Sequence, residues 1–107
     1  MAGNLNPRRR VAVLGATGSI GASVLDVIAR HPSRFAVEAL VAGSQVGPLL
    51  KLCAQFRPRV AAVADESKLE ELRDGLEAIG CGTKARAGAA AIDDIAADPA
   101  SDTVVAA

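Results

Sequence analysis

The spacing that most clearly indicates a functional site in this chain is that of three glycines, Gly15, Gly18 and Gly21. They form the pattern Gly-x-x-Gly-x-x-Gly, which is one residue longer than the Gly-x-Gly-x-x-Gly fingerprint of dinucleotide-binding loops. The first glycine permits a tight exit from a strand, the second lets backbone N–H groups approach a pyrophosphate, and the third lets a helix pack closely. The pattern therefore predicts a loop that holds an anionic phosphate group.

The segments on either side of this loop have the periodicities that such a site requires. Residues 11–14 are all apolar, as in a buried parallel strand. A helix is predicted from about Ser19, with its free N–H groups and positive dipole end toward the phosphate. Its apolar face follows helical spacing and comprises Ile20, Val24, Val27 and Ile28. The helix ends at His31, because a residue before proline is disfavoured in helical geometry.

The turn after the second predicted strand, residues 35–42, bears on which dinucleotide would fit. This turn consists of Gly43, Ser44 and Gln45. In a right-handed β-α-β unit it lies beside the glycine loop, where the adenosine ribose is bound. An acidic residue there would bind the ribose 2′-hydroxyl and disfavour a 2′-phosphate, and none is present. The turn favours NADP over NAD, although an ordinary turn with Ser44 as a helix cap fits both.

The rest of the chain continues to alternate between helical and strand patterns. Helices are predicted at residues 46–56, 67–79 and 88–97, and strands at residues 59–63, 83–87 and 102–107. Ser67 and Glu70 fit a capping box, and Gly75 weakens its helix by about 1 kcal/mol relative to alanine. We expect an α/β fold, a Rossmann-like three-layer arrangement of a parallel sheet with helices on both faces, truncated at its end. Residues 1–10 are expected to be a flexible flank, and residues 11–107 an incomplete NADP(H)-binding domain.

The composition argues against several classes of partner. The 107 residues include twelve Lys and Arg and twelve Asp and Glu, so the formal net charge is zero. This balance argues against nucleic acid and anionic membrane surfaces as partners. No apolar run approaches the roughly 20 residues of a membrane span, and the polar start does not resemble a secretory signal. A small-molecule ligand is the interpretation that remains.

Other reactive or charged side chains are interpreted as structural. Cys53 and Cys81 have no metal-ligand spacing, and we expect buried or partly buried free thiols in a reducing cytoplasm. His31 lies at the far end of its helix, about 15 Å from the glycine loop at 1.5 Å per residue, which argues against a general base. The basic run at residues 8–10 is at the opposite end of its strand from the loop, and we expect it to be solvated.

An ordered set of segments resembles the 1-deoxy-D-xylulose 5-phosphate reductoisomerase family. The segments lie at residues 15–28, 32–35, 39–43, 56–58 and 63–66. The resemblance implies a reductoisomerase of non-mevalonate isoprenoid biosynthesis. Such an enzyme rearranges 1-deoxy-D-xylulose 5-phosphate and reduces the product with NADPH to 2-C-methyl-D-erythritol 4-phosphate, and a divalent metal, Mg or Mn, acts as Lewis acid. The resemblance covers only the amino-terminal NADPH-binding part of the family's longer protein.

The resemblance also assigns positions to the cofactor. It places NADPH at Thr17, Gly18, Ser19 and Ile20 in the phosphate loop, and at Gly43, Ser44 and Gln45 after the second strand. Many family members have Lys-Asn where this chain has Ser44-Gln45, so a cationic contact to the 2′-phosphate is missing. The family's catalytic and metal-binding residues lie beyond Ala107, so none is assigned in this chain. The resemblance further implies a homodimer in the bacterial cytoplasm, and we expect the 107-residue chain alone to be inactive.

Two other functions are compatible with the residues. The chain could be the cofactor domain of another NADP-dependent reductase, of the semialdehyde or acyl-phosphate type, whose nucleophilic cysteine would lie downstream. It could also be a non-enzymatic module that senses a nucleotide, which needs only a binding site and a partner surface. An assay of the longer protein with each substrate class separates the first alternative from the reductoisomerase.

Overall fold

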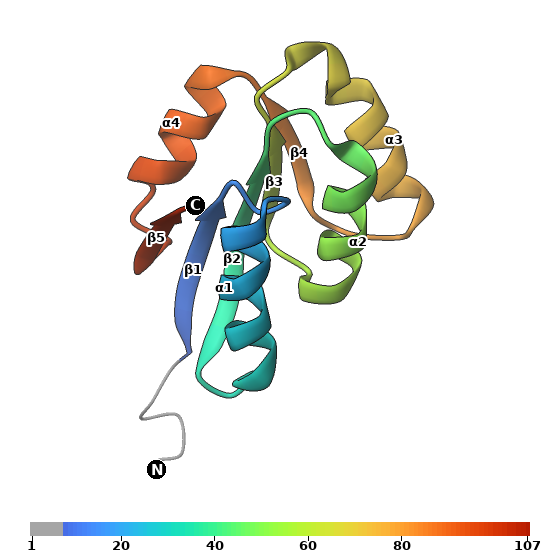
Figure 1. Cartoon of the computed structure of the whole chain (residues 1–107). Coiled ribbons are helices and arrows are strands. Elements are labelled where there is room, and N and C mark those ends of the chain that lie inside the picture. The colour runs from blue at the N-terminus through green and yellow to red at the C-terminus, as the bar shows by residue number, and fades with distance from the viewer. Residues whose placement is uncertain (1–7) are drawn as a thin grey trace.

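Strands and helices alternate through residues 8–107, the part of the chain that this computed structural model describes (Figure 1). The strands are β1 (Arg9–Leu14), β2 (Phe35–Ala42), β3 (Val60–Val63), β4 (Lys84–Ala87) and β5 (Thr103–Ala106). The helices are α1 (Ser19–Arg30), α2 (Val46–Phe56), α3 (Leu69–Ala78) and α4 (Ala89–Ala97), with the short 3₁₀ helix η2 (Glu66–Lys68) before α3. The predicted α/β fold is confirmed.

The sheet is parallel throughout, with the strand order β4-β3-β2-β1-β5. The chain therefore moves outward from β1 to β4 and then returns to the other side of β1. Because such crossovers are right-handed, the helices of the outward path cover one face of the sheet, and the returning helix α4 covers the other. The direction reverses between β1 and β5, which is the place where open α/β sheets bind ligands.

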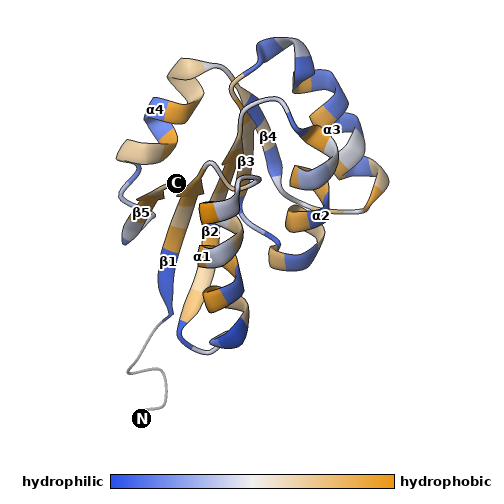
Figure 2. Cartoon of the chain, viewed as in Figure 1, coloured by the Kyte–Doolittle hydropathy of each residue, from blue (hydrophilic) through white to orange (hydrophobic). Residues whose placement is uncertain are grey.

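Two apolar clusters hold these three layers together. On one face, α1, α2 and α3 pack against the sheet, mainly through Leu25, Ile28, Leu49, Cys53, Leu72 and Leu76. On the other face, Ile95 of α4 packs against Ala12, Val41 and Ala62. Figure 2 shows strands that are largely hydrophobic apart from the start of β1 and parts of β4, and helices that alternate between hydrophobic and hydrophilic residues. The alternation is what an amphipathic helix on a buried sheet requires.

The rotation of α1 about its axis differs from the prediction. Ile20 and Val27, expected in the core, are 64% and 52% exposed, whereas Gly21 and Leu25 are buried. Gly21 lies against the loop that precedes the helix, and the face of α1 that carries Gly21 and Leu25 is therefore the buried one. Val24 and Ile28 were predicted correctly, because they lie on both the expected and the observed face.

The predicted capping box is wrong, and the alternative helix cap at Ser44 is not observed. The side chain of Asp65 accepts hydrogen bonds from the Ser67 N–H and hydroxyl, and so caps η2 in place of the expected capping box. At α2 the capping position is Gln45 rather than Ser44, and no side chain bonds to the helix end. Both helices nevertheless begin near the predicted residues.

The basic run at the start of the chain is only partly the expected flank, because β1 already begins at Arg9. Arg10 donates from Nε to Oε1 of Glu38 over 2.9 Å, and Arg59 binds the other carboxylate oxygen. Glu38 is 1% exposed and lies where the β1–β2 register shifts, between Val11 and Ala12 on β1. The bond to Glu38 raises the pKa of Arg59. Residues 1–7 of the predicted flank lie outside the described residues.

Both cysteines are buried free thiols, as predicted. Burial, assisted by the neighbouring Cys81, raises the pKa of Cys53 to about 12. The Cys53 thiol is therefore neutral at physiological pH and behaves as a small apolar core side chain. Cys81 Sγ lies 2.9 Å from the Thr83 hydroxyl, which itself donates to the Pro58 carbonyl over 2.6 Å.

Candidate functional site

The glycine loop connects the end of β1 to the start of α1 at the carboxyl edge of the sheet. Ala16 N–H donates to the Val41 carbonyl of β2 over 2.8 Å, and Gly18 N–H donates to the Gly15 carbonyl over 3.1 Å. Gly15 has a φ of +75°, a left-handed conformation that glycine adopts without strain. A Cβ at Gly15 would also lie 2.7 Å from the Ala107 carbonyl oxygen. The tight exit predicted for Gly15 is thus observed.

Gly21 and Gly18 differ in what surrounds them. A Cβ at Gly21 would overlap the Gly15 carbonyl oxygen and would lie 2.9 Å from Ala16 Cα, so this glycine permits the predicted close packing of α1. A Cβ at Gly18 would meet only the Gly15 carbonyl oxygen, at 3.5 Å, which is an ordinary contact. The fold itself therefore does not require glycine at position 18, whereas a ligand that must approach the backbone there would.

The amino-terminal end of α1 faces the loop without a side-chain cap. The first α-helical hydrogen bond runs from Ala22 N–H to the Gly18 carbonyl, and no side chain bonds to the helix end. The preceding N–H groups, those of Ser19, Ile20 and Gly21, have no intrahelical carbonyl to bond. The first turn of α1 contains no acidic residue. This end of the helix therefore presents donors and a partial positive charge, as an anion site requires.

A shallow hollow of about 230 Å³ lies over this helix end. Its walls come from the glycine loop, the first turn of α1 and the residue after β5, and they comprise Gly15, Gly18, Ser19, Ile20, Gly21 and Ala107. The exposed Ile20 side chain is one wall, which accounts for an apolar residue outside the core. Thr17 is half-buried in the loop and does not line the hollow.

The second predicted contact region lies next to the loop, because β2 is the neighbour of β1. Gly43, Ser44 and Gln45 are all exposed there and offer a hydroxyl and an amide. The Gly43 carbonyl accepts a hydrogen bond from Asp65 N–H over 3.1 Å, which ties this turn to the end of β3. The structure thus brings the ends of β1, β2 and β3 together at one edge.

Asp65 is a residue near this site to which the sequence reasoning gave no role. It lies two residues after the end of the third strand, close to the position that Gly43 takes after the second, and this position is the signal that could have identified it. Hydrogen bonds from the Ser67 hydroxyl and backbone N–H lower the pKa of Asp65, so the side chain is an anion at neutral pH. The Asp65 carboxylate therefore places a negative charge near the turn, and this carboxylate accepts hydrogen bonds from Ser67.

Two larger hollows, of about 520 and 840 Å³, lie at the opposite, amino-terminal edge of the sheet, and both are lined by Arg8 and Arg10. Size alone would favour them, but in open parallel sheets dinucleotides bind outside the carboxyl ends of the strands. The smaller hollow, where the glycine loop and the helix end meet, is the one that lies at this carboxyl edge.

Side chains for catalysis or metal binding do not converge on this edge. His31 follows the last residue of α1 and so lies at the end of the helix away from the loop. Across residues 8–107, no group of three or more His, Cys, Asp or Glu side chains could hold a metal ion. In the same residues, no helix has the length and apolar character needed to cross a membrane.

Comparison with known proteins gives a consistent result. A protein of Xanthomonas oryzae pv. oryzae (strain PXO99A) named 1-deoxy-D-xylulose 5-phosphate reductoisomerase is 60% identical over 99 residues, which are 92% of this chain and 25% of that protein. The chain therefore spans about a quarter of the length of the curated relatives that it matches.

Solved structures of the same kind of protein share the fold. A DOX-P reductoisomerase in complex with magnesium superposes with a TM-score of 0.87 at 36% identity, over 91% of this chain and 24% of that one. A DOX-P reductoisomerase in complex with NADPH, fosmidomycin and magnesium gives 0.86 at 36% identity, over 90% and 23%. The family model for 1-deoxy-D-xylulose 5-phosphate reductoisomerase matches residues 11–107. This chain belongs to the 1-deoxy-D-xylulose 5-phosphate reductoisomerase family.

Proposed function

We propose that this chain is the NADPH-binding portion of a 1-deoxy-D-xylulose 5-phosphate reductoisomerase. The observation that carries the proposal is the uncapped amino-terminal end of α1, which opens onto a hollow beside Gly18. The N–H groups of Ser19 and Ile20 would bind the pyrophosphate, and Gly18 leaves room for it to reach the backbone. Gly15 and Gly21 hold the loop in the shape that this contact needs, and Thr17 lies between Gly15 and Gly18 in the same loop.

The turn after β2 would receive the adenosine end of the cofactor. Ser44 and Gln45 offer neutral donors that accommodate a 2′-phosphate, and Gly43 leaves open space above the backbone. The family membership supports NADPH over NADH, and one structural neighbour is a complex with NADPH. Without a lysine in this turn, we infer that the 2′-phosphate is held by hydrogen bonds and not by an ion pair.

The proposal for the longer protein follows from the family. It would isomerise 1-deoxy-D-xylulose 5-phosphate and reduce the rearranged product to 2-C-methyl-D-erythritol 4-phosphate with a hydride from NADPH. One structural neighbour is a complex with magnesium, but residues 8–107 do not supply a set of ligands for such an ion. We therefore assign metal and substrate binding to the part of the family's protein that this chain does not match. A homodimer in the bacterial cytoplasm completes the proposal.

A fluorescence titration of the 107-residue chain with NADPH tests the cofactor site. Gly18→Val should weaken binding by at least about tenfold, because the added side chain occupies the phosphate position. Gly18 has an extended backbone, with φ −86° and ψ 175°, so valine fits without unfolding the loop. Gly82→Val is the matched control, because Gly82 also has open space around it but precedes β4 at the other edge.

Two results would refute the site. One is equal affinity in the wild-type chain and in Gly18→Val, and the other is equal weakening in both variants, with circular dichroism showing that all the proteins are folded. For the longer protein, NADPH oxidation with 1-deoxy-D-xylulose 5-phosphate and magnesium is the expected activity. Oxidation of NADPH only with acyl phosphates would instead support the alternative reductase.

A further inference from the structure

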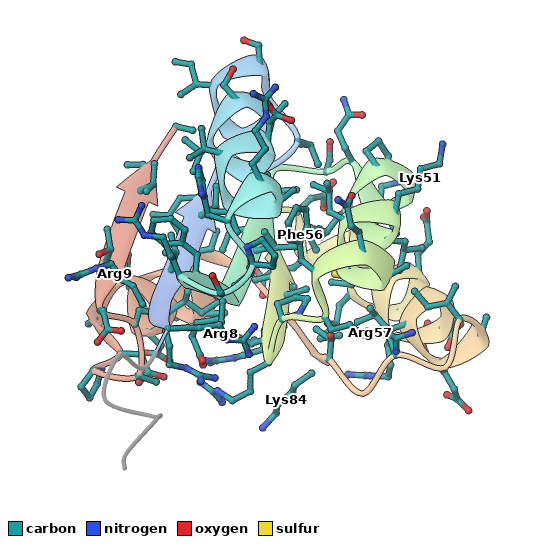
Figure 3. All side chains as sticks on the ribbon, turned by 90° about the horizontal axis from the view of Figure 1, so that it is seen from below. Arg8, Arg9, Lys51, Phe56, Arg57 and Lys84 are labelled. Atoms are coloured by element: carbon teal, nitrogen blue, oxygen red, sulfur yellow. The ribbon has the colours of Figure 1, made fainter. Side chains whose placement is uncertain are left out.

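Positive charge gathers at the edge of the sheet opposite the glycine loop. Figure 3 looks at this edge and shows Arg8, Arg9, Arg57 and Lys84 around it. The cations that begin or precede the strands here are Arg8, Arg9, Arg10, Arg34, Arg57, Arg59 and Lys84. The carboxylates bonded to this group are Glu38, Asp98 and Asp102. The net charge of zero therefore conceals an edge that carries an excess of cations.

A cavity of about 520 Å³ opens at this edge, within the range of small-molecule sites. One side of it is cationic and includes Arg8, Arg10, Arg57 and Arg59. The other side is apolar and includes Ile28, Pro32, Phe35, Val37 and Phe56. No carboxylate lines the cavity. Such a pair of walls suits a ligand with an anionic group and an apolar body.

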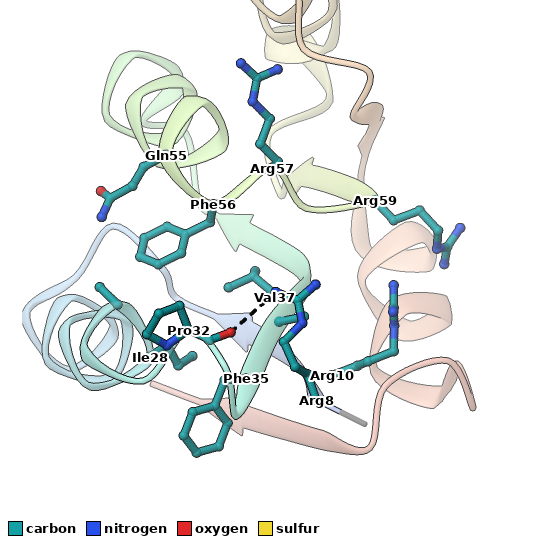
Figure 4. Close-up of a pocket in the computed structure, with 12 residues that line it drawn as sticks. Arg8, Arg10, Ile28, Pro32, Phe35, Val37, Gln55, Phe56, Arg57 and Arg59 are labelled. Carbon is teal, nitrogen blue, oxygen red and sulfur yellow. Dashed lines mark hydrogen bonds between the residues drawn. The ribbon is translucent and has the colours of Figure 1, made fainter. Parts of the chain in front are cut away.

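The four arginines differ in what they already bind. Arg10 and Arg59 share the buried carboxylate of Glu38, and Arg59 also binds Asp98. In the close-up of the cavity, Arg57 points away from Phe56, and it donates to the Gly80 carbonyl over 3.4 Å (Figure 4). These three guanidiniums therefore have partners away from the centre of the cavity.

Arg8 is placed differently. Its guanidinium lies beside Val37 and makes one long hydrogen bond, of 3.5 Å, to the Pro32 carbonyl (Figure 4). No carboxylate of residues 8–107 forms an ion pair with it. A guanidinium offers five N–H donors in a fixed plane, so most of the donors of Arg8 remain available. Arg8 thus supplies an uncompensated charge directly beside the apolar wall.

We propose that this cavity binds a small organic phosphate, with the phosphate group on the Arg8 guanidinium and the apolar body against Pro32 and Phe56. Guanidinium binds phosphate through two parallel hydrogen bonds, which makes arginine the preferred cation for such a group. The site is separate from the glycine loop, because it lies at the amino ends of the strands and is lined by none of the loop residues. It therefore does not depend on the proposed function.

The test is isothermal titration calorimetry, in which phenyl phosphate is added to the chain. Inorganic phosphate and phenol are titrated for comparison, because each carries only one of the two parts of phenyl phosphate. Phenyl phosphate should bind more tightly than either. Arg8→Gln should weaken phenyl phosphate binding by about tenfold, the loss expected for a charge-assisted contact. Arg9→Gln removes the same charge from the adjacent exposed residue, which does not line the cavity, and should change the affinity by less than about twofold.

Three outcomes would overturn the proposal. Equal weakening by Arg8→Gln and Arg9→Gln would mean that only the overall charge of the edge matters. Phenyl phosphate binding no tighter than inorganic phosphate would mean that the apolar wall takes no part. Binding of polyglutamate together with failure of phenyl phosphate would indicate an acidic macromolecule as the partner. Gly18→Val should leave phenyl phosphate binding unchanged, which keeps this site distinct from the NADPH site.

Discussion

Gly75 shows how a single contact can reverse a prediction from helix propensity. It lies inside α3, where alanine would ordinarily be favoured by about 1 kcal/mol. A Cβ at Gly75, however, would overlap Leu50 Cδ1 and lie 2.9 Å from Leu50 Cδ2, because α2 and α3 pack closely there. Displacing the end of the Leu50 side chain costs more than the propensity gain returns, so we predict that Gly75→Ala lowers the free energy of unfolding by up to about 2 kcal/mol, measured by urea denaturation.

The matched control is Gly47→Ala in α2. A Cβ at Gly47 would have no atom within 4 Å, so this variant should be neutral or more stable by up to about 1 kcal/mol. If Gly75→Ala stabilised the chain as much as Gly47→Ala does, Leu50 would leave room for a Cβ at position 75, and the prediction would be wrong.

Ser44 is the residue at which cofactor preference can be adjusted. It is exposed in the turn proposed to receive the 2′-phosphate, and it offers a hydroxyl but no positive charge. Ser44→Lys should tighten NADPH binding several-fold while leaving NADH binding nearly unchanged, because only NADPH carries the phosphate. Both affinities are measured by fluorescence titration at low salt. Ala78→Lys adds the same charge at the end of α3, and an equal gain there would disprove a local contact.

The sequence predicted the order and type of the helices and strands well, but it predicted the contacts between them less well. The bounds of β2 and α2 agree with the predicted residues 35–42 and 46–56, because apolar runs and proline-containing turns mark them clearly. The face of α1 was misassigned, because hydrophobic spacing does not record that Gly21 must touch the loop. The pairing of Glu38 with Arg10 was also missed, since a single acidic residue in a strand gives no signal of a partner from another strand.

That pairing joins three strands and should contribute to stability. Glu38 is buried in β2 and binds Arg10 of β1 and Arg59, which precedes β3. Glu38→Gln keeps the shape but leaves two guanidiniums around a neutral amide, so we predict a loss of about 1–3 kcal/mol in the free energy of unfolding. Asp94→Asn breaks the exposed pair with Arg86 and should cost less than about 1 kcal/mol. Equal costs in chemical denaturation would argue against a structural role for Glu38.

At the scale of the whole molecule, the two edges of the sheet are electrostatically different. The carboxyl edge combines backbone donors of α1 with the loop around Gly18, whereas the amino edge collects arginines from several segments. The sequence could predict the first, because the residues concerned are adjacent in the chain. It could not predict the second, because a sum of charges does not record where folding places them.

Heteronuclear NMR of the isotope-labelled chain can locate NADPH at the carboxyl edge residue by residue. On addition of NADPH, we expect amide shift changes at residues 15–21 and 43–45, the two segments that the parallel pairing of β1 and β2 brings together. Amides near Arg8 and Phe56 should remain unchanged. Shift changes confined to the arginine-lined cavity, or none at Gly18 in a saturated sample, would contradict NADPH binding at the carboxyl edge.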